Sequence, residues 1–435
     1  MKAAFYTLGC KVNQYETQIM EQKLSEAGYE IVSPDEPADV YIVNSCTVTG
    51  ESDRKTRQIL RRLRRLNPAA LTVLSGCFPQ SFPEKAEAIR EADVVTGTRE
   101  RGNIARIISQ ALETGRRVEQ VSDFEKDEPF EAMQARGLIG RTRAFVKIED
   151  GCSRYCSYCI IPYSRGPVRS KPLPALGREI SSLAARGYKE MVLVGINLSS
   201  YGKDCGLTLA DALETIERVP GDFRVRLGSL DPELIDADFL ARARTLKKLC
   251  PHFHLSLQSG CAATLKRMNR PYSPAEYARS VALLREAFPG CGVTTDVIVG
   301  FPGETPEEFG ESLAFVERIG FSQMHVFMYS RREGTRAARM PGQIEKNEKE
   351  RRSRRMIEAG LRSRREFLER QAGETLPVLF EAASVPGEYE GFAPNYAPVR
   401  LRSQQDLHGR LLTVRVTGVD PADGEACRGE PCGAG

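Results

Sequence analysis

The sequence predicts an α/β protein in three parts: an N-terminal α/β domain with a parallel sheet, a partial (β/α)6 barrel and a small C-terminal β-barrel. Short apolar runs alternate with segments of helical periodicity as far as residue 330, which is the pattern of parallel sheets. A basic stretch of helical character follows over residues 344–371, and short β runs separated by Gly, Pro and Asn fill the tail. We place the domains at residues 1–114, 138–368 and 371–435.

Length and composition narrow the class of protein. A length of 435 residues favours two or three domains, and no run reaches the ~18 apolar residues of a membrane-spanning helix. Polar residues follow the first ten residues at once, so the apolar stretch there is too short for a signal peptide. We expect a cytoplasmic protein with no membrane partner. Twelve cysteines stand beside only four histidines, which favours iron–sulfur clusters or an all-Cys zinc site over disulfides.

The first domain carries one cysteine after each of its predicted strands. The strands are expected at residues 3–8, 40–43 and 71–74, and helices at 14–27, 53–66 and 83–90. Cys10, Cys46 and Cys77 come directly after the three strands. Because ligands bind at the carboxyl edge of an open parallel sheet, three residues distant in sequence are expected on one rim.

A charged segment over residues 115–142 reads as a linker or covering loop, and six strand candidates follow it. They lie at residues 145–149, 191–194, 223–227, 253–257, 294–299 and 324–329. Helical stretches lie between most of them, so a partial barrel is expected, with its chemistry at the C-terminal ends of the strands. In the tail, β runs at 378–381, 397–401 and 411–416 predict a small barrel of the type used to bind nucleic acids.

The strongest chemical motif is Cys152-x3-Cys156-x2-Cys159, directly after the first barrel strand. Three cysteines in eight residues can hold three irons of a [4Fe–4S] cluster and leave the fourth iron free to bind a small molecule. The alternatives are a zinc knuckle and an electron-transfer cluster. Zinc would need a fourth ligand, and no further Cys or His lies nearby in the sequence.

Cys10, Cys46 and Cys77 predict a second cluster with an open iron. For any one of them the alternative is a buried apolar thiol, which is common. The repeated position after a strand favours the cluster. The other six cysteines show no such pattern and are expected to be structural: Cys205, Cys250, Cys261, Cys291, Cys427 and Cys432.

The spacing of Cys152, Cys156 and Cys159 resembles that of the radical S-adenosylmethionine (SAM) superfamily. The chain also resembles radical SAM methylthiotransferases over nearly its whole length, through TLGCKVNQYET at 7–17, VNSCTVT at 43–49, SGC at 75–77 and DVIVGFPGET at 296–305. The tail is similar to the small RNA-binding barrel of that family, the TRAM domain. The resemblance implies two [4Fe–4S] clusters and SAM as cofactors.

Within this family, the phrase GCKVNQYET at 9–17 most resembles the branch that acts on threonylcarbamoyladenosine at position 37 of tRNA. The other branches act on isopentenyladenosine in tRNA and on an aspartate of a ribosomal protein. The resemblance implies attachment of a methylthio group to C2 of the adenosine in the anticodon loop, with an electron donor such as flavodoxin or ferredoxin. An alternative from another class is a non-catalytic RNA-binding iron–sulfur sensor, which has no need of a SAM pocket.

Further cofactor-binding candidates lie after the barrel strands. By resemblance Tyr158 is expected at the adenine of SAM, and the others near its methionyl, ribose and adenine groups: Asn197, Ser256, Gln258, Gly300 and Glu304. For each of these, and for Gly303 after Pro302, turn or capping roles are the alternative.

RNA contacts are expected from aromatic and basic residues. In the tail the candidates are Tyr389, Phe392, Tyr396, Arg400 and Arg402, and the alternative is that the aromatic rings pack the core of the small barrel. Residues 51–66 carry seven basic and two acidic side chains, which suits either a phosphate backbone or a solvated helix face.

Overall fold

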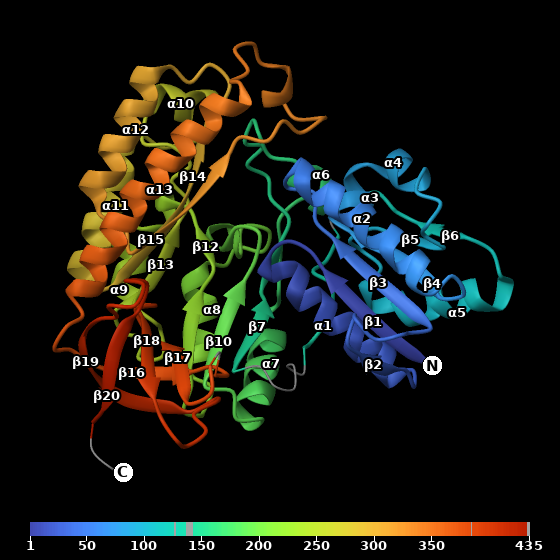
Figure 1. The fold of residues 1–435 in the computed structure, drawn as a ribbon, viewed down its shortest axis with the longest axis horizontal. Helices are drawn as coiled ribbons and strands as arrows, with labels where there is room; N and C mark the ends of the chain where they lie inside the picture. The colour runs from blue at the N-terminus through green and yellow to red at the C-terminus, as the bar shows by residue number, and fades with distance from the viewer. Residues whose placement is uncertain (126–127, 136–141, 384, 433–435) are drawn as a thin grey trace.

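A computed structural model describes residues 1–125, 128–135, 142–383 and 385–432. The predicted start of the second domain at residue 138 and the last three residues of the tail lie outside this range. Figure 1 shows the N-terminal domain beside the larger central part, with the small barrel below the latter. No helix among the described residues is long and apolar enough to cross a membrane.

The N-terminal domain has a six-stranded, entirely parallel sheet in the order β2-β1-β3-β4-β5-β6. The three predicted strands are confirmed as β1 (Lys2–Thr7), β3 (Val40–Ser45) and β4 (Leu71–Gly76). The other three were not predicted: β2 (Glu30–Val32), β5 (Val94–Thr96) and β6 (Val118–Gln120). The sheet therefore extends past residue 114 into the segment predicted as a linker.

Helices cover both faces of this sheet (Figure 1). They are α1 (Lys11–Glu26), α2 (Gly50–Leu66), α3 (Cys77–Ser81), α4 (Pro83–Glu87) and α5 (Ile104–Thr114). Leu60 and Leu63 of α2 pack in one apolar core, and Leu24 of α1 packs with Ile107 of α5 in the other. This layering leaves the carboxyl edge of the strands open for Cys10, Cys46 and Cys77.

The central part is built on six parallel strands, as predicted. In sequence order they are β7 (Arg143–Lys147), β10 (Glu190–Val194), β11 (Arg224–Leu227) continued by β12 (Ser229–Leu230), β13 (His252–Leu255), β14 (Gly292–Val299) and β15 (Gln323–Met328). The third strand is interrupted at Gly228, where a β-carbon would lie 2.9 Å from the Leu193 carbonyl oxygen. Neighbouring strands in space follow each other in sequence, which gives a partial barrel.

Seven helices and a short ribbon lie between or beside these strands in the described ranges. The helices are α6 (Ile161–Arg165), α7 (Leu173–Ala185), α8 (Leu209–Glu217), α9 (Ala237–Ala243), α10 (Ala262–Arg267), α11 (Pro274–Ala287) and α12 (Pro306–Ile319). A two-stranded ribbon of β8 (Glu149–Asp150) and β9 (Arg169–Ser170) flanks the predicted cluster loop.

Helix α13 (Lys346–Glu369) leads into the closed C-terminal barrel, whose order is β16-β17-β18-β20-β19. Its strands are β16 (Thr375–Phe380), β17 (Glu388–Phe392), β18 (Pro398–Arg402), β19 (Leu411–Val419) and β20 (Cys427–Pro431). The predicted small barrel is thus confirmed, with two strands more than its sequence pattern indicates.

Candidate cysteine sites and interior cavity

The structure brings Cys10, Cys46 and Cys77 together at the carboxyl edge of the first sheet. The sulfurs of Cys10 and Cys77 lie 4.0 and 3.9 Å from the same atom, Oδ1 of Asn13. Gly9 has φ +101°, and a β-carbon there would lie 2.6 Å from that of Cys46. Glycine is therefore required for Cys46 to approach the Cys10 loop.

Three thiols of this kind fit an iron–sulfur cluster. Burial raises the pKa of Cys77 to about 12 and also raises that of Cys46, which favours the neutral thiol in the absence of a bound metal. No group of three His, Cys, Asp or Glu side chains in the described ranges surrounds a single metal-ion position. A cluster does not require this, because each cysteine binds a different iron.

The second group of thiols, Cys152, Cys156 and Cys159, lies in the loop between β8 and α6. The Cys159 amide donates to the Cys156 carbonyl at 2.9 Å. Burial raises the pKa of Cys152 to about 11 and that of Cys159 to about 12. The Arg270 guanidinium approaches the Cys156 sulfur at 3.4 Å and supplies positive charge beside it.

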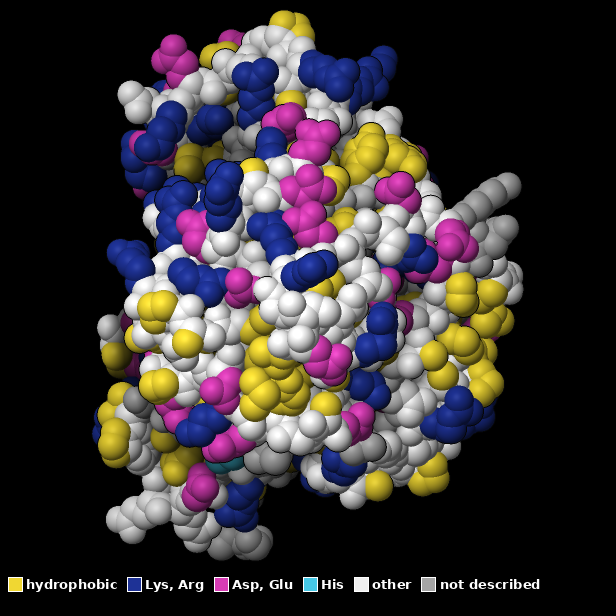
Figure 2. All heavy atoms as spheres, turned by 90° about the vertical axis from the view of Figure 1, so that its right-hand side faces the viewer, with side chains coloured by type: hydrophobic (Ala, Val, Ile, Leu, Met, Phe, Trp, Pro, Cys, Tyr) yellow, Lys and Arg dark blue, Asp and Glu magenta, His cyan; other side chains and the backbone are white. Residues whose placement is uncertain are grey.

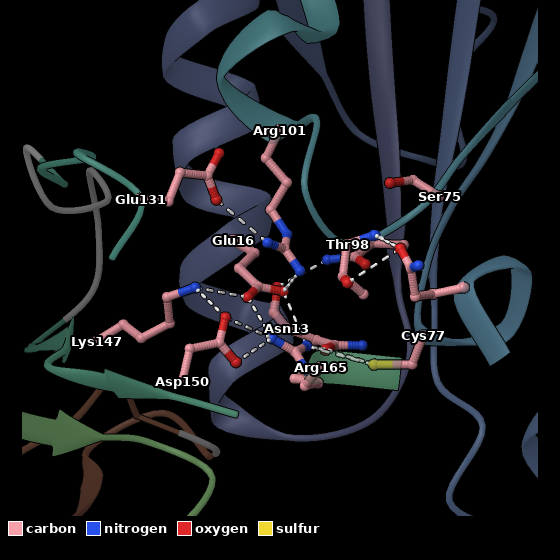
Figure 3. Close-up of polar contacts among 12 residues, drawn as sticks. Asn13, Glu16, Ser75, Cys77, Thr98, Arg101, Glu131, Lys147, Asp150 and Arg165 are labelled. Carbon is pink, nitrogen blue, oxygen red and sulfur yellow. Dashed lines mark hydrogen bonds and ion pairs between the residues drawn. The ribbon is translucent and has the colours of Figure 1, made fainter. Parts of the chain in front are cut away.

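A buried polar network reaches Cys77 of the first cysteine group (Figure 3). Its centre is Arg165 at the end of α6, which donates to Cys77 at 3.4 Å and to Asn13 at 2.7 Å. The residue after Arg165, Gly166, accepts a hydrogen bond from the Cys152 amide at 3.0 Å. A single short segment thus contacts one cysteine of each group.

The same network balances charge in the protein interior. Arg165 binds Glu16 at 2.6 Å, Lys147 binds Glu16 at 3.0 Å, and Arg101 lies 3.0 Å from it (Figure 3). Although burial alone raises it, these three cations hold the pKa of Glu16 at about 2. Sequence reasoning missed these residues, because their partners are more than 80 positions apart in the chain.

A second network reaches Cys156 from the barrel strands. Asn197, a predicted cofactor-binding residue, donates to Asp231 at 2.8 Å, and Asp231 forms an ion pair with Arg270. Asn197 also caps a short 3-10 helix by accepting from the Ser199 amide. The expected capping role is therefore present, together with a link through Arg270 to the cysteine loop.

The other predicted cofactor-binding residues divide into two groups. Tyr158 packs edge-to-face on Phe301, and Gln258, with φ +66°, follows Ser256 in the turn after β13. Glu304 is buried and accepts from the Gly300 amide at 2.7 Å and from Arg352 at 2.6 Å.

The turn after β14 contains two glycines, Gly300 and Gly303, whose backbone conformations favour glycine. Gly300 has φ +70° and Gly303 has φ +75°, so both adopt the left-handed backbone expected of turn residues.

A cavity of about 540 Å³, partly open to solvent, lies where the three domains meet. Its walls come from the start of α1, the barrel strands and the C-terminal barrel, and include Cys10, Lys11, His254, His325 and Tyr396. Three of the four histidines of the chain line it. A volume of this size suits a small organic group.

The basic run of α2 is largely neutralised by nearby acids. Arg54, Arg61, Arg62 and Arg64 each pair with a carboxylate, at distances between 2.5 and 3.2 Å. Figure 2 shows the face on the side of the N-terminal domain, where basic side chains are interspersed with acidic ones rather than forming one continuous patch. These pairs favour the interpretation of α2 as a solvated helix face over that of a surface for a phosphate backbone.

The RNA-contact candidates of the tail also have protein partners. Tyr396 stacks on His252 and Phe392 at ring distances of 4.7 and 4.8 Å. Tyr389 packs against the core of the small barrel, and Arg400 pairs with Glu390, Asp420 and Asp423. Arg402 is exposed on β18.

Comparison with known proteins gives consistent matches. Residues 2–97 match the uncharacterized protein family UPF0004, and residues 146–316 match the radical SAM superfamily. Among solved structures, the radical SAM methyltransferase TsrM from Kitasatospora setae has a TM-score of 0.60 at 15% identity, covering 77% of this chain and 76% of its own. This similarity shows the fold alone.

Curated relatives cover almost the entire chain. The threonylcarbamoyladenosine tRNA methylthiotransferase MtaB of Bacillus subtilis (strain 168) is 38% identical over 95% of this chain and 93% of its own length. MtaB of Thermotoga maritima is 38% identical over 98% and 96%. The tRNA-2-methylthio-N(6)-dimethylallyladenosine synthase of Pelotomaculum thermopropionicum is 33% identical over 96% and 95%. With these identities over nearly its full length, the chain belongs to the tRNA methylthiotransferases of the radical SAM superfamily, enzymes that use SAM and a [4Fe–4S] cluster.

Proposed function

We propose that this enzyme attaches a methylthio group to C2 of N6-threonylcarbamoyladenosine at position 37 of tRNA. The observation that carries the proposal is the pair of cysteine groups linked by the segment from Cys152 to Gly166, beside a cavity large enough for a modified base. Four relatives named for threonylcarbamoyladenosine, 35–38% identical to this chain, support the choice of base.

Each cysteine group has its own role in the proposal. Cys152, Cys156 and Cys159 hold the cluster that binds SAM, and Cys10, Cys46 and Cys77 hold a second [4Fe–4S] cluster. When bound, SAM and these clusters would supply three things: a methyl group, a sulfur atom, and a radical that can take the hydrogen from C2. C2 carries an unactivated C–H bond that no side chain of usual basicity removes.

The protein supplies position and charge. Arg270 places a cation beside Cys156, and Asp231 and Asn197 hold Arg270 in that orientation. We assign Tyr158, Ser256 and Gln258 to the SAM pocket. Gly300 and Glu304 belong to the turn beside this pocket, where Glu304 binds both the Gly300 amide and Arg352.

The partners in this proposal are the anticodon loop of tRNA and a flavodoxin or ferredoxin as electron donor. The C-terminal barrel is proposed as the TRAM-like RNA-binding domain. The twelve cysteines are all free thiols, as in proteins of a reducing compartment, which supports a cytoplasmic location.

A second candidate substrate is N6-dimethylallyladenosine in tRNA. Relatives named for that modification are 31–35% identical to this chain, which overlaps the lower end of the first group. The two substrates differ at N6, where one carries a hydrocarbon and the other a carboxylate and a hydroxyl.

The test uses reconstituted full-length enzyme and tRNA from a strain that lacks the gene. Mass spectrometry of digested nucleosides should show the methylthio derivative of threonylcarbamoyladenosine with the wild-type enzyme. Cys156→Ala should abolish both this product and 5′-deoxyadenosine. Cys46→Ala should still release 5′-deoxyadenosine but form no methylthio nucleoside. Full 5′-deoxyadenosine production by Cys156→Ala, or methylthiolation only of dimethylallyladenosine by the wild-type enzyme, contradicts the proposal.

A further inference from the structure

Lys11 is a cation in the wall of the cavity where the three domains meet, and it forms no ion pair with another described residue. It is the residue after Cys10, begins α1, and keeps an exposed side chain within the cavity wall. Within the described ranges its ammonium group forms no hydrogen bond or ion pair, and Tyr396 and Glu190 act on it only at longer range.

The other charged groups of the wall already have partners. Asp296 lies 3.3 Å from the His254 imidazole, and Glu390 accepts from Arg400 at 2.9 Å. Arg364 donates to the Glu425 carbonyl at 2.7 Å. Among the described residues of this wall, Lys11 is therefore a charged side chain whose donors are all open to a ligand.

An unpaired ammonium group in a recess favours an anionic ligand. Partial removal from water weakens its hydration, and a carboxylate restores the lost interaction through a charge-assisted hydrogen bond. The guanidinium groups of Arg143 and Arg226 stack near Tyr396 in the same region and add to the positive potential there. Their acid partner, Glu190, is already bound by Arg226.

The chemistry of the base places an anion near Lys11. C2 and C6 of adenine flank the same ring nitrogen, N1, and C6 carries N6. A base that presents C2 to the cysteine group of Cys10 must hold its N6 substituent close by. The threonylcarbamoyl substituent ends in a carboxylate, whereas the dimethylallyl substituent is a hydrocarbon.

We propose that Lys11 binds the threonyl carboxylate of the substrate and is a specificity-determining residue of this enzyme. This inference rests on the proposed function. Uncharged polar side chains of the same cavity wall, Gln14 and Gln323, suit the hydroxyl and urea groups of the same substituent. A hydrocarbon in this position would leave the ammonium group and these polar groups without partners, which disfavours it.

The experiment compares two anticodon stem-loop RNAs, one with threonylcarbamoyladenosine at position 37 and one with its carboxyl methyl ester. Reconstituted full-length wild type, Lys11→Gln, Lys11→Arg and Lys23→Gln are assayed for methylthio product, and KM is determined for each RNA. Lys23→Gln is the matched control, because it removes a lysine from the same helix at a partly exposed site where Lys23 pairs with Glu26. Iron content and 5′-deoxyadenosine release without RNA report on cluster integrity.

We expect Lys11→Gln to raise KM for the acid RNA about tenfold or more while leaving KM for the ester unchanged. Lys11→Arg should keep most of the preference for the acid, and Lys23→Gln should match the wild type. An equal rise in KM for the acid and the ester RNA overturns the inference, because Lys11 would then contact the RNA backbone or support the cysteine site. An unchanged KM for both RNAs also overturns it. Absence of product from wild type with the acid RNA would instead refute the proposed function.

Discussion

Arg165 is the centre of the buried network beside Cys77. Its side chain is fully buried and binds Glu16, Asp150, Asn13 and Cys77. Buried ion pairs contribute little net stability, but removal of one partner leaves the other charges uncompensated. Arg165→Met should therefore lower the free energy of unfolding by about 3–5 kcal/mol, measured by urea titration of the full chain.

The control for this change is Arg54→Met. Arg54 pairs with Glu51 one helical turn away on the exposed face of α2, where such pairs have little effect on stability. The urea midpoint of this variant should match the wild type. Equal midpoints for Arg165→Met and Arg54→Met would mean that the interior network does not depend on Arg165.

At the scale of elements, a buried acid of β10, Glu190, holds two arginines of β11 that contact the C-terminal barrel. Glu190 accepts hydrogen bonds from Arg224 at 2.6 Å and Arg226 at 2.8 Å. The two guanidinium groups also donate to backbone carbonyls of the C-terminal barrel, including those of Phe392 and Pro394 at 2.7 and 2.8 Å. Glu190 thus orients the side chains that join the two barrels.

This docking should be sensitive to acid. Burial alone raises the pKa of Glu190, but Arg226 and Arg224 lower it from 4.5 to about 2. A lowered carboxyl pKa stabilises the fold above pH 4.5, and this stabilisation is lost as the pH falls toward 2. It amounts to about 3 kcal/mol. Measured between pH 6 and 3, the unfolding free energy should fall less steeply in Glu190→Gln than in wild type.

Glu113→Gln serves as the comparison, because Glu113 is exposed on α5. Its stability should follow the wild-type pH dependence. If Glu190→Gln shows the wild-type slope as well, the acid sensitivity of the enzyme arises from other carboxyl groups.

Over the whole molecule, the sequence predicted those elements that are long and apolar. Six barrel strands and three strands of the first sheet were found because each contains a short apolar run, although β15 is partly exposed along its length. Strands β2, β5 and β6 have three residues each, too few for a periodic pattern. Strands β17 (EYEGF) and β20 (CRGEP) are largely polar, because a small barrel exposes one face of every strand.

The sequence predicted those parts of the candidate site whose positions follow from the order and direction of the strands. Cysteines after parallel strands must share one edge, so Cys10, Cys46 and Cys77 were placed together correctly. The Arg165–Glu16 pair joins residues 149 positions apart, and no local pattern encodes it. The cavity is likewise a product of docking, since no single domain contains it.

Because three domains form its wall, binding of one substrate should protect all three against local unfolding. An anticodon stem-loop with threonylcarbamoyladenosine should slow amide hydrogen exchange several-fold at the start of α1, along β13 and around Tyr396. Mass spectrometry of peptides from the full-length enzyme measures this, with the same stem-loop carrying unmodified adenosine as control. The control RNA lacks the threonylcarbamoyl substituent on N6 and should protect the C-terminal barrel more than α1. Protection confined to one domain with the modified RNA would show that the base does not enter the cavity, because a ligand there contacts all three walls at once.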